Sequence, residues 1–397
     1  MFILSVIAAI LAGVGALVTS VQTALTLLFR RRGRFFEHGP HVPSGWAGRF
    51  RQGGFSRRRH VSILKPVCGV DDELEANLDS FAAIRGVAYE VIVSIADLHD
   101  PALPIVERVM ARHASVAWKL VIGGDPKLEA FNRKVARLIA AMPHAAGDVL
   151  LISDSNVRVA PDDVAMTVHA FDDPLVGCVS NLFTGSGARS FGASIESLHL
   201  LSFVAPGAVI AASANIPCVV GKSMAIRRDV LAAVGGFEAF VRVLAEDQAI
   251  GLAVRDAGYD VGLSPVVVHN VVVKRTLQRA LDRQIRWNKI RYAFSKRTYA
   301  SEWLLFPFAF AALAALLHPV AWPLPAAILA LRLLQVAMLA RATNAPLGIR
   351  ELLLLPLFDL LHFGTQFVPY FDDRVTWRGH ATRLGPKTVL MDFKDAA

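Results

Sequence analysis

The chain has 397 residues, of which 54% are hydrophobic and only 19% are charged, and its formal net charge is +9. This balance is too apolar for an ordinary soluble enzyme and indicates membrane segments beside one sizeable domain. Lys and Arg fall largely in blocks next to apolar runs. That pattern favours anionic lipid headgroups and a nucleotide diphosphate over nucleic acid as partners.

The N-terminal residues 2–29 contain no charged side chain and are long enough to cross a bilayer. Arginines follow at once from Arg30, whereas a cleaved signal peptide carries its charges before a shorter apolar run. We therefore predict a transmembrane anchor at residues 1–30, with its C-terminal side in the cytoplasm. Residues 31–60, rich in Gly, Arg and His, are interpreted as a basic juxtamembrane linker.

Short β-rich runs then alternate with helical patterns. Strands are expected at 61–64, 89–95, 118–122 and 149–153, and helices at 71–84, 104–112 and 131–142. This alternation predicts βαβ units and a mostly parallel, doubly wound α/β sheet. Ligands of such sheets bind beyond the carboxyl ends of the strands, so the residues there are the first candidates for a site.

Two aspartates directly follow expected strands, Asp97 and Asp154. An isolated Asp at such a place usually caps a loop. Asp154 differs because Asn156 adds a second oxygen ligand two residues on. One carboxylate with few further protein ligands can hold Mg²⁺ or Mn²⁺ when water and substrate phosphates complete the shell. Such a cation would neutralise the charge of a leaving diphosphate.

Two further polar pairs are expected to open helices. Asn132 and Lys134 follow a Gly-Gly turn and would place a helix N-terminus and an ammonium near phosphate, although a solvated basic face explains them equally well. Glu246 and Asp247 begin a helical pattern, where acidic residues usually complement the helix dipole. The functional alternative makes one of these carboxylates the general base for an acceptor hydroxyl.

Arg283, Arg286 and Trp287 lie on neighbouring faces of one expected helix, directly before an apolar segment. A guanidinium can hold a leaving diphosphate, and an indole can form the wall of a sugar site. Interfacial anchoring of the helix is the structural alternative.

The C-terminal part turns apolar again. Residues 303–317 and 326–340 are expected to form a membrane hairpin with its tip outside. A third apolar segment, 352–371, contains Pro356 and Asp359, so we expect it in the interface or as a re-entrant segment. The expected division into anchor, linker, catalytic domain, C-terminal transmembrane or interfacial helices and cytoplasmic tail is 1–30, 31–60, 61–300, 301–371 and 372–397.

A set of motifs in order resembles a known family. They read LKPVCGVDDELEANLDSF, SIADLHDPA, NRKVARL, ISDSNVRVAPD, CVVGKSMAIRRDVLAAVGGFEAF, LAEDQAIGLAVRDAGYD and RQIRWNKIR, and they cover about residues 61 to 295. The set resembles ceramide glucosyltransferases and their bacterial relatives, within the GT-A, QxxRW-type glycosyltransferases. The resemblance implies a Rossmann-like GT-A domain between N- and C-terminal transmembrane helices.

The resemblance also implies roles for the acidic residues. Asp97 matches the aspartate that contacts the uridine of the donor, and Asp154 matches the aspartate at the metal and diphosphate. Asn156 stands where relatives often carry Gly or Asp, and it is the second predicted metal ligand. Asp247 matches the proposed catalytic base.

The remaining matches are basic, amide and aromatic. Arg283, Arg286 and Trp287 match the (R/Q)xxRW motif, which binds diphosphate and lines the acceptor site. Asn132 and Lys134 match an NxK element that the resemblance places near the nucleotide.

The function implied is a membrane-bound inverting glycosyltransferase that moves a hexose from a UDP-sugar to a lipid hydroxyl, with ceramide favoured. Its partners would be the UDP-sugar donor, the lipid acceptor and the bilayer, without nucleic acid, and its cofactor Mg²⁺ or Mn²⁺. We expect an integral protein of a bacterial inner membrane with a cytoplasm-facing catalytic domain. The alternatives are a hopanoid or diacylglycerol glycosyltransferase, a processive polysaccharide synthase, or a non-catalytic membrane protein that binds nucleotide or nucleic acid.

Overall fold

The computed structural model describes residues 1–32, 59–129, 131–377 and 380–391. Most of the linker predicted at 31–60 and the end of the predicted tail therefore lie outside the described residues. The chain divides into two compact units. The helical unit comprises Met1–Arg31, Gly185–Gly207 and Val273–Ala397, and the sheet unit comprises Arg32–Thr184 and Ala208–Val272.

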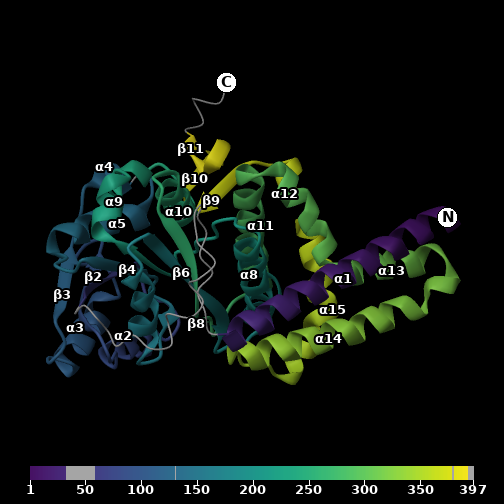
Figure 1. Cartoon of the computed structure of the whole chain (residues 1–397), viewed down its shortest axis with the longest axis horizontal. Coiled ribbons are helices and arrows are strands. Elements are labelled where there is room, and N and C mark those ends of the chain that lie inside the picture. Colours follow the sequence, from purple (N-terminus) through teal and green to yellow (C-terminus); the bar gives the residue numbers. More distant parts are fainter. Residues whose placement is uncertain (33–58, 130, 378–379, 392–397) are drawn as a thin grey trace. The chain divides into compact units, whose positions relative to one another are not determined.

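The sheet unit is built on an eight-stranded sheet of order β3-β2-β1-β4-β7-β6-β8-β5 (Figure 1). Its first four strands are parallel and lie where the sequence predicts them: β1 His60–Pro66, β2 Ala88–Ile95, β3 Trp118–Ile122 and β4 Val149–Ser153. Their residues are largely Val, Ile and Leu, as expected for strands that are buried on both faces.

The other half of the sheet contains antiparallel pairs. Strand β7, Ser223–Arg227, runs antiparallel to β4, and β6, Val176–Ser186, runs antiparallel to β7. The two-residue strand β5, Val157–Arg158, is antiparallel to β8, Asp260–Val271. The predicted α/β class is confirmed, whereas the parallel arrangement applies to the N-terminal half of the sheet.

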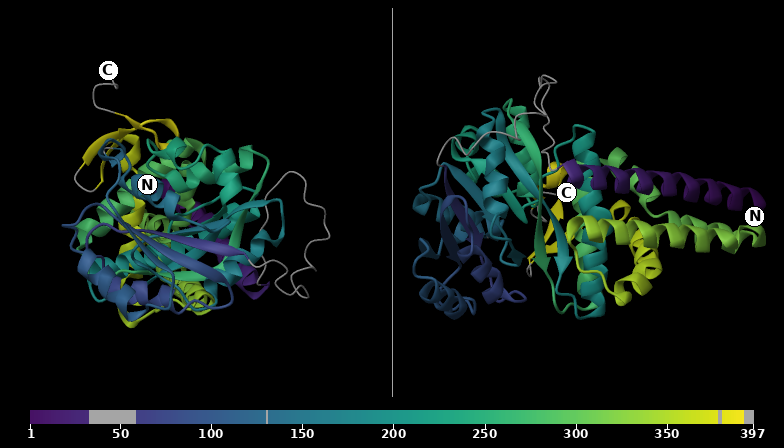
Figure 2. Two further views of the ribbon diagram at one scale, coloured as in Figure 1. Left: turned by 90° about the vertical axis from the view of Figure 1, so that its left-hand side faces the viewer. Right: turned by 60° about the horizontal axis from the view of Figure 1, so that its bottom comes forward.

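Helices lie on both faces of the sheet, with α2 and α3 on one face and α5, α9 and α10 on the other (Figures 1 and 2). The helices of this unit are α2 Leu74–Ala82, α3 Leu103–Arg112, α4 Pro126–Glu129, α5 Arg133–Ala141, α6 Asp163–Val168, α9 Arg228–Ala233 and α10 Glu246–Asp256. Helix α5 buries Val135, Leu138 and Ala141, which recur along one stripe and direct that face to the core.

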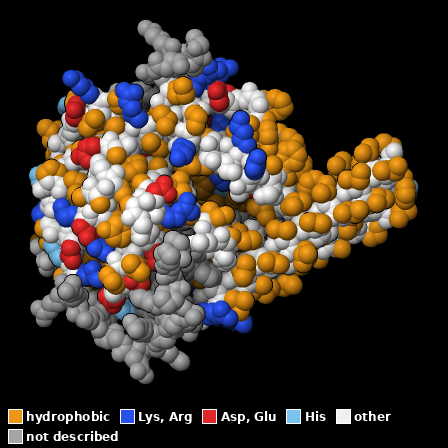
Figure 3. All heavy atoms as spheres, turned by 45° about the horizontal axis from the view of Figure 1, so that its top comes forward, with side chains coloured by type: hydrophobic (Ala, Val, Ile, Leu, Met, Phe, Trp, Pro, Cys, Tyr) orange, Lys and Arg blue, Asp and Glu red, His pale blue; other side chains and the backbone are white. Residues whose placement is uncertain are grey.

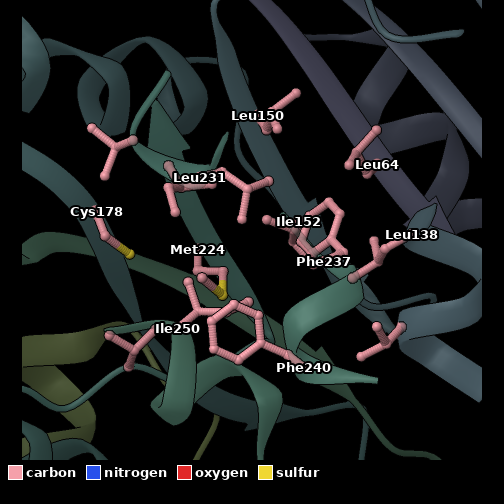
Figure 4. Packing of buried hydrophobic residues seen from close by; sticks show 14 of the residues in the cluster. Leu64, Leu138, Leu150, Ile152, Cys178, Met224, Leu231, Phe237, Phe240 and Ile250 are labelled. Atoms are coloured by element: carbon pink, nitrogen blue, oxygen red, sulfur yellow. The ribbon is translucent and has the colours of Figure 1, made fainter. Parts of the chain in front are cut away.

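The core of the sheet unit joins residues that are far apart in sequence (Figure 4). Leu64, Leu150 and Ile152 from parallel strands pack with Met224 of β7 and Phe237, and all are almost fully buried. Close packing across β4 and β7 therefore fixes the antiparallel half of the sheet against the parallel half.

The helical unit contains long apolar helices and a small sheet. Its helices are α1 Phe2–Arg32, α7 Phe191–His199, α11 Leu277–Phe294, α12 Lys296–Ser301, α13 Pro307–Leu317, α14 Pro323–Thr343 and α15 Ile349–Thr365. A π-helical segment, Leu200–Val204, continues α7 into α8, Ala205–Ser213. The C-terminal strands β9 Arg374–Trp377, β10 His380–Leu384 and β11 Leu390–Met391 form an antiparallel sheet.

Four helices in the described part of the chain are long and apolar enough to cross a membrane: Phe2–Arg32, Phe191–Ser213, Pro319–Thr343 and Ile349–Tyr370. Hydrophobic side chains dominate the surface of α1, α13 and α14 (Figure 3). Phe191–Ser213 lies outside the apolar segments expected from the sequence.

The expected apolar segment 303–317 is broken. The helices Lys296–Leu305 and Pro307–Leu317 form a pair bent by 66°. Proline disfavours helical geometry in the residue before it, so Phe306 is the natural place for the break.

The third C-terminal segment is one helix, α15, which continues through Pro356. Its Asp359 is fully buried, and both carboxylate oxygens accept hydrogen bonds from Arg332 of α14, at 3.0 and 3.1 Å. The charge of Asp359, which argued for an interfacial position, is therefore paired inside the helical unit. By length and composition the segment is able to span.

Candidate active site

The carboxyl ends of the parallel strands gather the first candidate residues. Strand β1 pairs in parallel with both β2 and β4, so these three strands end at one edge of the sheet. Asp97 follows β2, Asp154 follows β4, and Lys65 lies at the end of β1. The edge thus carries acidic and basic side chains at the place where α/β sheets bind ligands.

Asp154 lies at the centre of a cluster of lysines. One carboxylate oxygen, Oδ1, is 3.1 Å from Lys134 Nζ, and the other, Oδ2, is 2.8 Å from Lys222 Nζ. Lys65 Nζ donates to the backbone oxygen of Asp154 at 2.7 Å. Burial alone would raise the pKa of Asp154, but the two ammonium groups outweigh burial and hold the pKa well below its ordinary value. Asp154 is therefore ionised at neutral pH.

Lys65 is fully buried, and burial lowers the pKa of its ammonium to about 7, opposed by the negative charge of Asp154. The Lys65 ammonium also lies 3.9 Å from the centre of the Phe81 ring. The fraction of Lys65 that is protonated near neutral pH therefore depends on the charges around it.

Lys134 connects Asp154 to the start of α10. Its Nζ is 2.9 Å from Glu246 Oε1 and donates to the backbone oxygen of Gly221 at 3.2 Å. Burial opposes the charged form, but the carboxylates of Asp154, Glu246 and Asp247 outweigh it and raise the pKa of Lys134. Lys134 is therefore a permanent cation among three acidic residues.

Asn132 holds this arrangement in place. It is fully buried, and its Oδ1 accepts from the backbone N–H groups of Lys134 and Val135 at 3.1 and 3.2 Å, which caps α5. Its Nδ2 donates to the backbone oxygen of Val243 at 2.8 Å and to Glu246 at 3.4 Å. These bonds favour a positioning role for Asn132, and its predicted proximity to nucleotide stays a prediction.

Asp247 is the half-buried carboxylate of the acidic pair. Its Oδ2 accepts from the backbone N–H of Gly221 at 2.5 Å, and its Oδ1 accepts from that of Gln248 at 2.8 Å. Burial and the negative charge of Glu246 raise the pKa of Asp247 to about 6, against the opposing charge of Lys134. A carboxylate with a pKa near the working pH is suited to accept a proton.

Gly221 is tightly enclosed between the side chains of Lys134 and Asp247. A Cβ atom at this position would lie 2.5 Å from Lys134 Nζ and 3.1 Å from Asp247 Oδ2. A side chain at this position would therefore displace the Lys134 ammonium from its present place.

The two predicted metal ligands are held by one ammonium group. Lys222 Nζ lies 2.8 Å from Asp154 Oδ2 and donates to Asn156 Oδ1 at 2.9 Å. Among the residues that the structure describes, no group of three His, Cys, Asp or Glu side chains is placed to hold a metal ion. As it stands, the donor set does not fit a divalent ion, which would have to displace the Lys222 ammonium.

Asp97 is exposed at the loop after β2, and its Oδ1 accepts from the backbone N–H of His99 at 2.7 Å. The next acidic residue, Asp100, is buried and binds the backbone N–H groups of Gly69 and Ala102 at 2.9 to 3.1 Å. Asp100 therefore stabilises the loop, while Asp97 is accessible to a ligand. Its contact with uridine stays a prediction.

The (R/Q)xxRW residues lie on α11 of the helical unit. Arg283 forms an ion pair with the buried Glu196, which also pairs with Arg275 at 2.8 Å, and the Arg283 guanidinium lies 4.7 Å from the centre of the Trp287 ring. The ring centroids of Trp287 and His199 are 5.6 Å apart. Arg286 is half-buried on the same helix. The approach of these residues to the acidic cluster stays a prediction.

Sequence reasoning missed Lys65, Gly221 and Lys222 as parts of the cluster. A signal exists for two of them, because a Gly-Lys pair directly precedes a short apolar run at 223–227. Lys222 reaches Asp154 because β7 pairs with β4 in the register Ser153 to Ser223. This pairing brings residue 154, which follows β4, next to residue 222, which precedes β7.

The fold and the cluster define a class. The mixed α/β sheet unit has the GT-A type of glycosyltransferase fold, and the same chain carries several apolar helices. The family model described as Glycosyl transferase family 21 matches residues 15–390, and the chain belongs to this family.

Similar proteins agree with this assignment. Ceramide glucosyltransferases 1 and 3 of Caenorhabditis elegans are each 26% identical to the chain over 238 residues, 59% of this chain and 50% of theirs. The ceramide glucosyltransferase of Komagataella phaffii is 26% identical over 191 residues, 43% of this chain and 38% of its own. The chain thus spans about half the length of the curated C. elegans relatives it matches.

Among solved structures, a mannosyltransferase from Pyrobaculum calidifontis in complex with GDP-Man and Mn²⁺ is similar, with a TM-score of 0.50 and 20% identity. The similarity covers 91% of this chain and 99% of that chain, and it shows the fold.

Proposed function

We propose that the chain transfers a hexose from a UDP-sugar to a lipid hydroxyl, with ceramide as the favoured acceptor and with inversion at the sugar carbon. The observation that carries the proposal is the pairing of a proton-accepting carboxylate with a lysine-rich pocket. Asp247 is joined through Gly221 to Lys134, and Lys134 contacts Asp154. A base and a set of cations are the two things that a single displacement of a nucleotide diphosphate requires.

The acceptor hydroxyl would attack the anomeric carbon while Asp247 takes its proton. The new bond joins the acceptor oxygen to that carbon, and the bond from the carbon to the diphosphate oxygen breaks. The bonding electron pair leaves with UDP, and the proton rests on the Asp247 carboxylate. One displacement on the face opposite the leaving group inverts the stereochemistry.

The lysines would stabilise the charge that develops on the leaving group. The ammonium groups of Lys134 and Lys222 contact the carboxylate of Asp154, and the ammonium of Lys65 contacts the backbone oxygen of Asp154. Preorganised cations in a partly dry site act strongly on a developing negative charge. Asp97, at the same sheet edge, is proposed to contact the uridine.

The divalent ion, Mg²⁺ or Mn²⁺, with Asp154 and Asn156 as its protein ligands, stays a prediction. Because it would have to displace the Lys222 ammonium, no step of the proposed transfer depends on it. When bound, such an ion supplies positive charge to a diphosphate. The similar mannosyltransferase binds Mn²⁺ together with GDP-Man.

The acceptor is proposed to be a membrane lipid because the chain carries apolar helices long enough to span, and because its curated relatives are named ceramide glucosyltransferases. Arg283, Arg286 and Trp287 are proposed to line the acceptor side and to bind diphosphate. A location in a bacterial inner membrane with the sheet unit in the cytoplasm is part of the same proposal.

The test compares purified wild-type protein with Asp247→Asn in lipid vesicles that contain ceramide. A general base contributes about 10²- to 10⁴-fold, so the variant is expected to lose transfer by that factor while it still binds UDP. Asp256→Asn serves as the matched control, because Asp256 is exposed at the other end of α10. Undiminished transfer by Asp247→Asn would remove Asp247 from the role of base.

A further inference from the structure

Lys222 occupies the place predicted for a divalent ion. Its ammonium bridges the two oxygens that would otherwise bind a divalent ion, at 2.8 Å from Asp154 and 2.9 Å from Asn156. The side chain is only 13% exposed, so the contact lies within the pocket.

The fold holds Lys222 at this place through the backbone as well as the side chain. The backbone N–H of Asp154 donates to the backbone oxygen of Lys222 at 3.4 Å, and the antiparallel register of β4 and β7 begins at the next residue, Ser153 opposite Ser223. The preceding residue, Gly221, is in turn bound to Asp247. The backbone that carries Lys222 is therefore held by Asp154 on one side and, through Gly221, by Asp247 on the other.

The ammonium of Lys222 differs from that of Lys134 in the charges around it. Lys134 is paired with two carboxylates, Asp154 and Glu246, whereas Lys222 contacts Asp154 and the neutral Asn156. A second carboxylate, which would attract a metal, is absent from position 156. A lysine ammonium is an established type of phosphate ligand and acts as a compact point charge.

We propose that Lys222 is a built-in cation for the diphosphate of the donor, and that UDP binds to this chain without a divalent ion through contacts that depend on Lys222. The inference rests on the proposed function, since it concerns the donor site of the same enzyme. It goes beyond that function because it makes Lys222, rather than a metal ion, the group that neutralises the charge of the donor diphosphate.

The test measures the affinity of the full-length protein in detergent for UDP and for UMP, by calorimetric titration, with EDTA and with Mn²⁺. Wild type is expected to bind UDP in EDTA with an affinity within about threefold of that in Mn²⁺, because the ammonium already supplies the charge. Lys222→Met is expected to lose about tenfold or more of its UDP affinity in EDTA, as one charge-assisted contact disappears. Mn²⁺ is expected to restore most of that loss.

Three controls sharpen the comparison. UMP lacks the second phosphate, so its affinity is expected to change little in Lys222→Met. Lys222→Arg keeps the charge and is expected to retain most UDP affinity in EDTA. Lys127→Met removes a positive charge from an exposed position of the same unit and is expected to behave as wild type.

The wild-type titration decides the proposal even if Lys222→Met does not fold. UDP binding by wild type that requires Mn²⁺ would overturn the inference and leave the proposed transferase function standing. Equal loss of UDP and UMP affinity in folded Lys222→Met would also overturn it. Wild type that binds no UDP under either condition would contradict both the inference and the proposed function.

Discussion

At the scale of single residues, the ionisation of Asp247 gives the site a testable pH dependence. Burial and the neighbouring Glu246 raise the pKa of Asp247 to about 6. The base is the deprotonated form, so its population falls as the pH drops through this value. We expect kcat/KM for transfer to fall by about tenfold for each pH unit below about 6.

The pH profile is measured by initial rates in lipid vesicles, and the fluorescence of the folded protein is recorded at every pH as a control for unfolding. Asp154 does not contribute to the same limb, because its pKa lies well below the ordinary carboxyl value. A profile that stays flat to about pH 5 while the protein remains folded would contradict the role of Asp247.

Some residues of the site can be predicted from the sequence, and others cannot. Asp97 and Asp154 were found from local order, because each directly follows a strand that its composition reveals. Lys222 was missed because its contact with Asp154 depends on the antiparallel pairing of β7 with β4, which joins segments nearly seventy residues apart. No local pattern specifies which strand a short apolar run will pair with.

At the scale of elements, the buried ion pair between α14 and α15 is expected to hold the C-terminal helices together. Arg332 and Asp359 are 3% and 0% exposed and form two hydrogen bonds. Replacing Asp359 alone by Leu leaves a buried guanidinium without its carboxylate, which is expected to cost about 3–5 kcal/mol of stability. The double change Arg332→Met with Asp359→Leu is expected to restore most of that loss.

Thermal unfolding of the detergent-solubilised protein measures this effect. The exposed pair of Arg383 and Asp373, 3.3 Å apart, provides the control, since Asp373→Leu is expected to cost at most about 1 kcal/mol. A loss in the double variant as large as in Asp359→Leu would show that the helices do not tolerate an apolar contact at this point.

Elements were predicted well where one period dominates the sequence. The strands β1 to β4 and helix α5 follow from apolar runs and from an N-cap, and α1 follows from length and composition. The break at Phe306 and the satisfied charges of α15 were not foreseen. Both depend on features that the apolar pattern does not contain. The break follows from Pro307, and the buried Asp359 is paired with Arg332 on another helix.

At the scale of the whole molecule, the chain combines a nucleotide-sugar transferase fold with helices whose surface is largely hydrophobic. Exposed apolar side chains such as Leu17, Leu316 and Leu334 are 65%, 84% and 58% accessible on these helices. A surface of this kind is stable in lipid and costly in water. The combination is what the proposed transfer requires, in which a water-soluble donor meets an acceptor delivered by the membrane.

The most direct measurement of the central claim is mass spectrometry of lipids from cells that express the chain, compared with cells that express Asp247→Asn. We predict a new lipid in the wild-type cells that is heavier than its parent by one hexose, with a ceramide core, and its absence from the variant. A hopanoid or diacylglycerol core would correct the acceptor and keep the transferase. Identical lipids in both cultures, with the wild-type protein folded in the membrane, would contradict the claim that this chain places a sugar on a lipid.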